Sequence, residues 1–352
     1  MADRIASGTV RQRWPERQTE TGSSVVPPTP SLRSSGVMPA PRDTVLNMGD
    51  TVVMDLPDGR ELAWLESGDP KGPAVFVFHG TPGSRLEVSC DQVPIISSGV
   101  RFIAVDRPGY GHSTFQRGRR LADWASDVTH LADHLKIDGF SVIGVSGGGP
   151  HAAACARFSE RVLGAGIVSG VGPLAEPGAE NEMMGFNRVV TRLARRSQYL
   201  VYPPFVLSAA IFRRWPELAL RAASGQMPNS DIEILSRPSV RSAYIDTYRR
   251  SPSTSALAAA QDFALFASDW GFRLDDITVP VDIWHGDDDR NVPISHGRLQ
   301  AERIPGARLH ECPGEGHLLV IDRLDEILRT VSAHGAGGSD PRKPRAGGEV
   351  GP

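Results

Sequence analysis

The chain has 352 residues, of which 40% are hydrophobic and 22% are charged, and its formal net charge at pH 7 is −3. This composition is typical of a globular protein large enough for one α/β domain with an insertion, or for two domains. The small negative charge provides no electrostatic basis for binding nucleic acid or an anionic membrane surface. Cys90, Cys155 and Cys312 are too widely spaced for a metal site or a disulfide framework, so we expect neither.

The two ends of the chain differ in composition from its centre. Residues 1–44 are rich in Pro, Ser, Thr and Arg and lack the apolar core of a secretory signal, and residues 335–352 are rich in Gly and Pro. We therefore expect two disordered tails. The longest apolar run, 199–212, is interrupted by two prolines and is shorter than the ~20 residues that a membrane span needs. We expect a cytoplasmic protein without a membrane span, of unknown oligomeric state.

Between the tails, strand and helix patterns alternate, which favours a mostly parallel sheet with helices on both faces. The first two strands are joined by Pro57-Asp58-Gly59-Arg60 and are expected to form a hairpin. The expected strands are 51–56, 61–66, 74–78, 101–105, 140–145, 162–168, 279–284 and 307–311, and the expected helices are 121–137, 294–304 and 318–333.

Residues 173–268 interrupt this alternation, because they contain helical patterns and loops but no convincing strand. We expect a helical cap inserted between two parts of a core, 45–172 and 269–334, with Trp270 and Phe272 anchoring its return to the sheet. Its apolar side chains could form a substrate pocket, although each could equally pack the cap onto the core. These residues are Met183, Met184, Phe186, Tyr199, Leu200, Val201, Tyr202, Phe205, Val206, Leu207, Ile211 and Phe212.

The most informative motif is Gly144-Val145-Ser146-Gly147-Gly148, which directly follows the apolar strand 140–145 and precedes a small-residue helix start. A nucleophile elbow requires this context, because its serine occupies a strained turn between strand and helix where flanking side chains would collide with backbone. The following helix directs its N-terminal N–H groups toward negative charge that develops nearby. The alternative is a glycine-rich turn with an incidental serine.

Two later loops provide partners for such a serine. Acyl transfer needs a base to take the proton of the nucleophile and an acid to orient that base, each on a loop after a later strand. The strand 279–284 is followed by Asp287, Asp288 and Asp289, and the strand 307–311 is followed by Gly314-Glu315-Gly316-His317. The order along the chain is therefore serine, aspartate, histidine.

These segments, together with His79-Gly80-Thr81-Pro82-Gly83 and Asp106-Arg107-Pro108-Gly109-Tyr110-Gly111, resemble the α/β-hydrolase superfamily. The resemblance is to its serine-nucleophile, cap-bearing branch near small esterases and proline iminopeptidases. It implies an α/β fold with a mostly parallel eight-stranded sheet, helices on both faces and an inserted helical cap. It also implies that Asp289 is the acid, three residues before Val292-Pro293, and that Asp287 and Asp288 are loop carboxylates.

The resemblance further implies that the oxyanion donors are the backbone N–H groups of Thr81 and Gly147. Asp106 and Arg107 are turn and packing elements in the superfamily, so we assign them no chemistry. We expect a surface or structural ion pair for Arg85. Ser146 would attack, His317 would act as general base and then acid, and Asp289 would orient His317.

We therefore predict a serine hydrolase, like a carboxylesterase, that cleaves a small apolar carboxylic ester, or a thioester, lactone or amide, without a metal or organic cofactor. Two alternatives remain: an aminopeptidase similar to proline iminopeptidase, and a non-catalytic hydrolase-fold receptor for a small molecule. Perhydrolysis or cofactor-free oxygen chemistry on the same scaffold is also open. An aminopeptidase needs cap carboxylates to hold a free amine, and we expect the available ones to lie on the surface: Glu176, Glu180, Glu182, Asp231 and Glu233.

Overall fold

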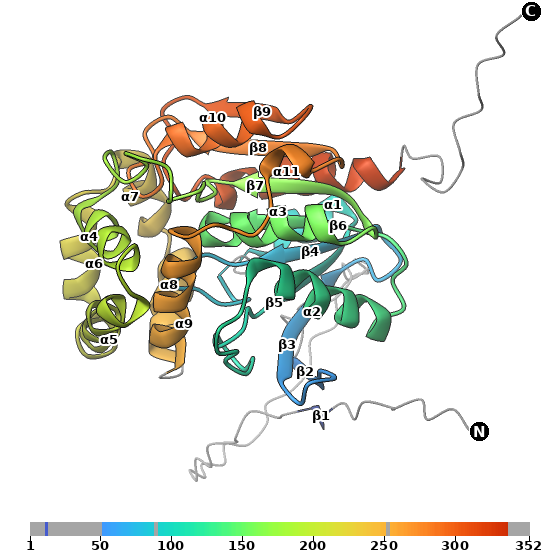
Figure 1. Ribbon diagram of the computed structural model, residues 1–352, viewed down its shortest axis with the longest axis horizontal. Coiled ribbons are helices and arrows are strands. Elements are labelled where there is room, and N and C mark those ends of the chain that lie inside the picture. The colour runs from blue at the N-terminus through green and yellow to red at the C-terminus, as the bar shows by residue number, and fades with distance from the viewer. Residues whose placement is uncertain (1–10, 13–50, 88–90, 251–253, 337–352) are drawn as a thin grey trace, which may run out of the picture.

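A computed structural model describes residues 11–12, 51–87, 91–250 and 254–336 (Figure 1). Nearly all of the two predicted tails lies outside this part of the chain. The described residues form one sheet of strand order β1-β2-β3-β5-β4-β6-β7-β8-β9. The strands are β1 Arg11–Gln12, β2 Val52–Asp55, β3 Glu61–Gly68, β4 Ala74–Phe78, β5 Arg101–Val105, β6 Phe140–Val145, β7 Val162–Val168, β8 Val281–Gly286 and β9 Arg308–Cys312.

Eight of these strands form the mostly parallel sheet that the sequence predicts. The hairpin β2–β3 pairs antiparallel, β3 also pairs antiparallel with β5, and the six strands from β5 to β9 across the sheet are parallel. The two-residue strand β1, which lies within the predicted N-terminal tail, adds a ninth strand antiparallel to β2. Because the carboxyl ends of parallel strands meet at one edge, the loops after β4, β6, β8 and β9 converge there.

Helices cover both faces of the sheet with separate hydrophobic cores. On one face, side chains of α2 Leu121–His134 and α3 Gly149–Phe158 belong to one buried cluster, and α10 Ile294–Arg303 packs against it. On the other face, α1 Gln92–Ser98 and α11 Val320–Ala336 belong to a second cluster. The helix α1 was not predicted from the sequence; it has seven residues, begins after the cap Asp91 and ends at Gly99, where φ is 68°.

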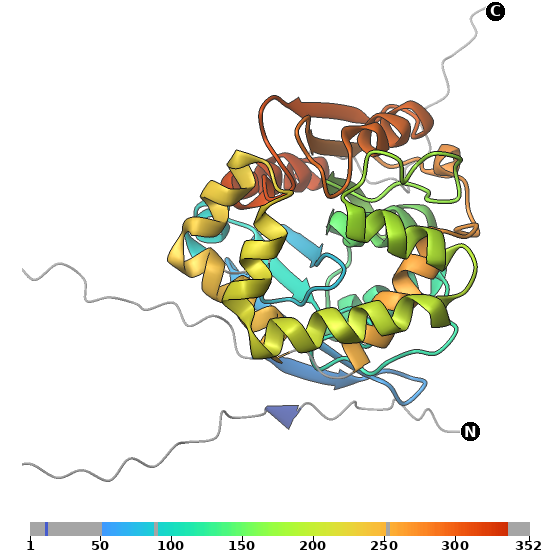
Figure 2. The same cartoon turned by 90° about the vertical axis from the view of Figure 1, so that its left-hand side faces the viewer.

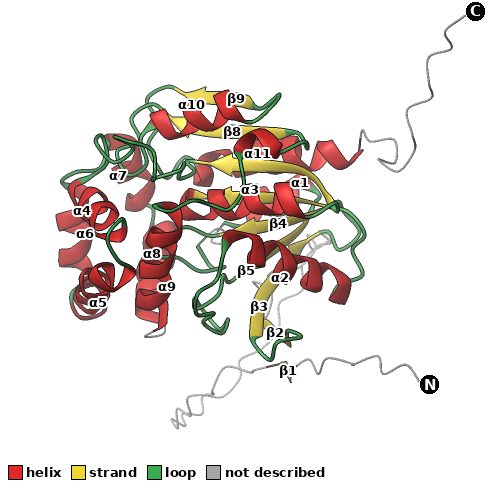
Figure 3. Cartoon of the chain, in the orientation of Figure 1, coloured by secondary structure: helices red, strands yellow, loops and turns green. Residues whose placement is uncertain are grey.

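The segment between β7 and β8 is helical (Figure 3). Among its described residues there is no strand, and we call its six α-helices the helical insert. Seen from their side in Figure 2, these helices are arranged around the ends of the central strands. The division of the chain into core and cap domains stays a prediction. The helices are α4 Gly185–Ala194, α5 Gln198–Arg214, α6 Pro216–Ser224, α7 Asn229–Ser236, α8 Pro238–Arg250 and α9 Thr254–Phe266.

Candidate active site

A cavity of about 810 Å³ lies between the carboxyl edge of the sheet and the helical insert. Ser146, His317, Thr81 and Gly147 all line it, so the structure brings four of the five predicted site residues to one space. The fifth, Asp289, is buried behind His317 with 4% of its surface exposed. Four loops that are distant in the sequence thus meet at one site.

The turn after β6 has the strained geometry expected of an elbow. Ser146 adopts a φ of 54°, in the left-handed region that costs a non-glycine residue roughly 1–3 kcal/mol. A Cβ atom at Gly144 would lie 2.2 Å from the Gly148 carbonyl oxygen, and one at Gly148 would lie 2.3 Å from the Phe78 carbonyl oxygen. Only glycine fits at these two positions. The Ser146 side chain makes no hydrogen bond with the described residues and lies at the cavity wall.

Asp289 links the loop after β8 to the loop after β9. Its Oδ1 accepts hydrogen bonds from the backbone N–H groups of Asn291 and Val292, both at 2.9 Å. Its Oδ2 lies 2.7 Å from Nδ1 of His317. Because an ionised carboxylate only accepts, Nδ1 of His317 carries the proton and Nε2 keeps its lone pair. His317 is therefore held in the tautomer that can take a proton at Nε2.

The electrostatic environment makes His317 more basic. Burial lowers the pKa of this ring, but the charge and hydrogen bond of Asp289 and the charges of Asp231 and Glu87 outweigh burial. The net result is a pKa above the ordinary value of 6.5. Since a general base works best with a pKa near the working pH, this shift suits proton transfer from a serine.

The segment after β4 packs directly against the elbow. A Cβ atom at Gly147 would lie 2.2 Å from Oγ1 of Thr81 and 3.1 Å from its backbone nitrogen. Glycine is therefore required here too, and the two backbone nitrogens predicted as oxyanion donors belong to segments in contact. This arrangement is compatible with two N–H groups that act on one oxygen atom.

Asp231 of α7 supports the histidine loop from the helical insert. It accepts hydrogen bonds from the backbone N–H groups of His317 and Leu318, at 3.0 and 2.8 Å. The expected surface position of Asp231 is wrong, since only 3% of the residue is exposed. Glu180 is also buried, at 6% exposed, where it pairs with Arg195. Asp231 has no local sequence signal for burial, because its partners are 86 and 87 residues away, whereas Arg195 is 15 residues from Glu180.

Glu87, which the sequence analysis did not select, also lines the cavity. Its Oε2 is buried without a hydrogen-bond partner in the described chain. Burial raises the pKa of this carboxyl from 4.5 to about 7, although the charge of His317 opposes the shift. Glu87 therefore changes charge near neutral pH beside the candidate base.

The remaining predictions for individual residues have mixed outcomes. Arg85 forms a buried ion pair with Asp106, in agreement with a structural role. Cys155 and Cys312 are buried free thiols, and Cys90 lies outside the described residues. Seven of the twelve apolar residues proposed for the pocket line the cavity: Met183, Met184, Phe186, Phe205, Leu207, Ile211 and Phe212. The other five do not: Tyr199, Leu200, Val201, Tyr202 and Val206.

Over the residues placed here, no group of three or more His, Cys, Asp or Glu side chains could hold a metal ion. No helix in the same part of the chain combines the length and the apolar character that crossing a membrane requires.

Comparisons with known proteins identify the fold family of the chain. The alpha/beta hydrolase fold family matches residues 73–324. A bifunctional esterase/perhydrolase of Acinetobacter calcoaceticus is 26% identical over 287 residues, which are 78% of this chain and 96% of that protein. A non-heme haloperoxidase of Rhodococcus erythropolis is 28% identical over 77% of this chain and 94% of its own length.

Solved structures show the same fold at lower identity. An esterase from Exiguobacterium antarcticum has a TM-score of 0.59 at 20% identity and covers 80% of this chain and 98% of its own. A bromoperoxidase from Bacillus anthracis has a TM-score of 0.60 at 20% identity and covers 79% of this chain and 96% of its own. The chain therefore belongs to the alpha/beta hydrolase fold family.

Proposed function

We propose that the protein is a serine hydrolase that cleaves a neutral, apolar carboxylic ester through an acyl-enzyme. The observation that carries this proposal is the shared cavity of Ser146, on its strained turn, and His317, whose Nδ1 lies 2.7 Å from Asp289. A serine, a correctly protonated histidine and a buried acid are the three parts that acyl transfer requires.

In the first half-reaction Oγ of Ser146 attacks the ester carbonyl carbon, and Nε2 of His317 takes the hydroxyl proton. The carbonyl oxygen becomes an oxyanion that the N–H groups of Thr81 and Gly147 stabilise. The intermediate collapses, the bond to the alkoxy group breaks, and His317 gives its proton to the leaving alcohol. In the second half, water attacks the acyl-enzyme, His317 takes a proton from it, and Ser146 regains a proton as the acid leaves.

The cavity wall favours an uncharged substrate with an apolar part larger than an acetyl group. Most of the lining residues are apolar, and the volume of about 810 Å³ lies at the upper end of that of ligand pockets. Among the described lining residues there is no Lys or Arg, whereas the carboxyl groups of Glu87 and Asp231 are present. A carboxylate-bearing substrate would find no Lys or Arg partner among these residues and would lie beside the two acids.

The aminopeptidase alternative has less support than the esterase. Asp231 is the one insert carboxylate among the described lining residues, and its two oxygens accept the backbone N–H groups of His317 and Leu318. The other four carboxylates considered for an aminopeptidase do not line the cavity.

A second candidate activity is perhydrolysis, because one of the relatives is an esterase/perhydrolase. In that reaction hydrogen peroxide would replace water in attack on the acyl-enzyme, so the acyl group would leave as a peracid. It uses the same serine, base and oxyanion donors, and an assay of peracid formation with added peroxide distinguishes it from simple hydrolysis.

The test is intact mass after treatment with a fluorophosphonate, followed by hydrolysis of p-nitrophenyl esters of increasing acyl length. We expect one adduct on the wild type, none on Ser146→Ala and very slow labelling of His317→Ala, with faster hydrolysis of medium-chain esters than of acetate. Ser169→Ala is the matched control, because Ser169 also has a positive φ, of 47°, but does not line the cavity. Absence of an adduct on folded wild type would overturn the proposal and favour a receptor.

A further inference from the structure

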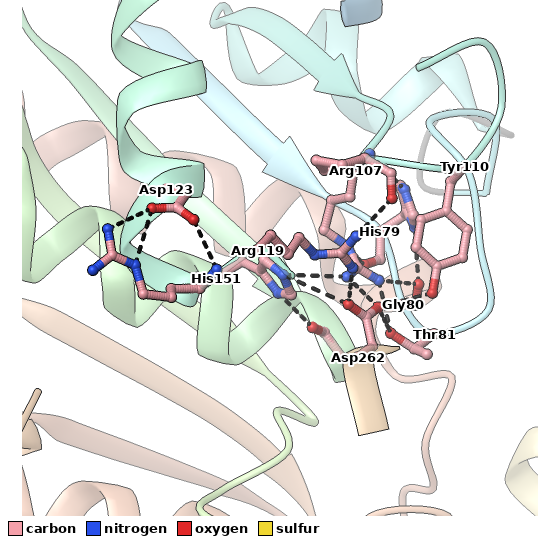
Figure 4. Close-up of polar contacts among 12 residues, drawn as sticks. His79, Gly80, Thr81, Arg107, Tyr110, Arg119, Asp123, His151 and Asp262 are labelled. Atoms are coloured by element: carbon pink, nitrogen blue, oxygen red, sulfur yellow. Dashed lines mark hydrogen bonds and ion pairs between the residues drawn. The ribbon is translucent and has the colours of Figure 1, made fainter. Parts of the chain in front are cut away.

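A cluster of buried charges lies directly behind the segment that carries Thr81 (Figure 4). Its centre is Asp262 of α9, whose Oδ2 accepts hydrogen bonds from Thr81 Oγ1 and Tyr110 Oη, both at 2.8 Å, and from Arg107 Nη1 at 2.5 Å. Oδ1 of Asp262 accepts from Nη2 of Arg119. The side chains of Asp262 and Arg107 are both 0% exposed.

Filling a core with this cluster costs more free energy than filling it with apolar side chains. Burying one charged group costs several kcal/mol even after relaxation, and well-packed apolar residues often give equal or greater stability. Burial raises the pKa of Asp262, but the charges of Arg107 and Arg119 outweigh burial and hold that pKa well below its ordinary range. Asp262 is therefore an anion, and the two arginines stay charged. Packing alone therefore does not account for two buried arginines at this position.

Arg107 contacts the peptide group that contains the proposed oxyanion donor. Its Nη2 donates to the carbonyl oxygen of Gly80 at 2.7 Å and to Oγ1 of Thr81 at 2.7 Å. The Gly80 carbonyl oxygen also lies 2.8 Å from Nδ1 of His79. Since Nε2 of His79 accepts from the backbone N–H of Arg107 at 3.1 Å, Nδ1 carries the ring proton and donates it. The Gly80 carbonyl thus has two donors, one of them a cation.

The geometry of a peptide group turns this contact into an effect on Thr81. The carbonyl of Gly80 and the N–H of Thr81 belong to one planar peptide unit, and in the trans form they point in opposite directions. Donors that hold the carbonyl on the cluster side therefore direct the N–H away from it. A charged donor on the carbonyl also polarises the unit, which strengthens the N–H as a donor.

The same cluster reaches the elbow through His151 of α3. Nδ1 of His151 lies 3.0 Å from the carbonyl oxygen of Gly147, and Nε2 lies 3.4 Å from Nη1 of Arg107. Burial and the charge of Arg107 lower the pKa of His151, so the ring is neutral near pH 7. A neutral ring that donates from Nδ1 to Gly147 can accept from Arg107 at Nε2. The guanidinium of Arg107 therefore contacts both donor segments: the first directly, at the Gly80 carbonyl, and the second through His151, which bonds Gly147.

We propose that Arg107, held by Asp262 of the helical insert, is a positioning residue that orients and polarises the Gly80–Thr81 peptide as an oxyanion donor. This inference rests on the proposed function, because it assigns a role within the same acyl transfer. It also means that docking of α9 helps to complete the oxyanion site, since Asp262 holds both Arg107 and Thr81.

The test compares Arg107→Met with Arg119→Met. Both arginines are buried and pair with Asp262, but Arg119 donates its other bond to the Pro108 carbonyl and contacts neither Gly80 nor Thr81. For Arg107→Met we expect kcat to fall about 10²–10³-fold, as after loss of an oxyanion donor, with KM nearly unchanged. For Arg119→Met we expect a similar drop in Tm but a loss in kcat of less than about tenfold.

A transition-state mimic separates positioning from stability. A trifluoromethyl ketone forms a hemiketal oxyanion with the serine, so its affinity should fall for Arg107→Met by about the same factor as kcat, whereas KM should not change. Equal losses of kcat in the two methionine variants, or unchanged affinity for the ketone, would overturn the inference. Should Arg107→Met not fold, Arg107→Lys serves instead. It keeps the charge but not the planar fork that bonds Gly80, Thr81 and Asp262 together, so a loss of kcat no larger than that in Arg119→Lys would overturn the inference.

Fluorophosphonate labelling distinguishes this inference from the proposed function. Wild type that is not labelled at Ser146 would overturn both. Normal labelling of wild type, with equal labelling rates in Arg107→Met, would overturn only the role of Arg107.

Discussion

The two halves of the candidate site carry opposite charge. Around His317 the neighbouring groups are the carboxyls of Asp289, Asp231 and Glu87, and their charges raise the pKa of the ring. Behind Thr81 the three charged groups have a net positive charge, since Arg107 and Arg119 both pair with the single carboxylate of Asp262. In the proposed mechanism a cation develops on the histidine and an anion on the substrate carbonyl. Each half therefore has the field that stabilises the charge forming there.

The halves also differ in how the chain builds them. Asp289 and His317 are 28 residues apart, on loops that follow the paired strands β8 and β9. Thr81 and Asp262 are 181 residues apart and meet only when α9 packs on the core. The insert nevertheless contributes to both halves, through Asp231 of α7 and Asp262 of α9. The helices that cover the cavity thus also hold the groups proposed to do the chemistry.

The largest effect should come from the acidic half, with Asp289→Asn. An Asn in this position can still accept the N–H groups of Asn291 and Val292 with its oxygen, but it then presents an NH₂ group to Nδ1 of His317. Nδ1 would have to accept, so the proton would move to Nε2 and the ring could no longer take the serine proton. We expect kcat to fall about 10⁴-fold with Tm little changed, as measured by ester hydrolysis and thermal unfolding.

Asp288→Asn is the control, because Asp288 is in the same loop and pairs with the exposed side chain of Arg290. We expect nearly wild-type kcat for that variant. If Asp289→Asn retained activity, or if Asp288→Asn lost as much, Asp289 would not be the orienting acid.

The next effect tests the oxyanion half through Gly147→Ala. The added methyl would meet Oγ1 of Thr81 at 2.2 Å, which pushes the two donor segments apart. We expect kcat to fall about 10²–10³-fold, the cost of one misplaced donor. Gly80→Ala adds the same group nearby, but its nearest contact is Cβ of Ser146 at 3.4 Å, an ordinary van der Waals distance. A larger loss of kcat in Gly80→Ala than in Gly147→Ala would contradict this explanation.

Local patterns were sufficient to predict eight of the nine strands and the loops that carry the candidate residues. The predicted strands 74–78, 101–105, 140–145 and 162–168 coincide with β4, β5, β6 and β7 residue for residue. The strand predicted at 279–284 begins two residues later, at Val281, directly after Pro280. The helix α1 was missed because its seven residues are too few to show a helical repeat.

The residues that support the candidate site could not be predicted in this way. Asp231 and Asp262 are single carboxylates on helices, and a pattern of this kind usually indicates a solvent-exposed face. Their burial depends on partners 86 to 181 residues away along the chain. Arg107 was predicted only as a packing element, since no local motif shows that its guanidinium reaches the Gly80 carbonyl. Contacts between the insert and the core require the folded structure.

The smallest predicted effect concerns the acidic half and is a shift in pH dependence caused by Glu87→Gln. His317 must be neutral to act as a base, so kcat/KM falls as pH falls through its pKa, which lies above 6.5. An ionised Glu87 favours the protonated ring. Without that charge the pKa of His317 should be lower, and the acidic limb of the profile should move to lower pH. The variant should therefore retain more of its maximal activity than wild type below neutral pH.

Glu315→Gln is the matched control, because Glu315 lies two residues before His317 but pairs with Arg323. Its profile should follow that of wild type.

Thermal unfolding provides an independent check on Glu87. Its folded pKa of about 7 exceeds the ordinary 4.5, so the folded state binds this proton more tightly than the unfolded state. Wild-type stability should therefore fall relative to Glu87→Gln as pH rises from about 4.5 to about 7, and remain lower above that range. If the two Tm curves stayed parallel and the acidic limbs coincided, Glu87 would not be a titrating neighbour of His317, and the acidic half would reduce to Asp289 and Asp231.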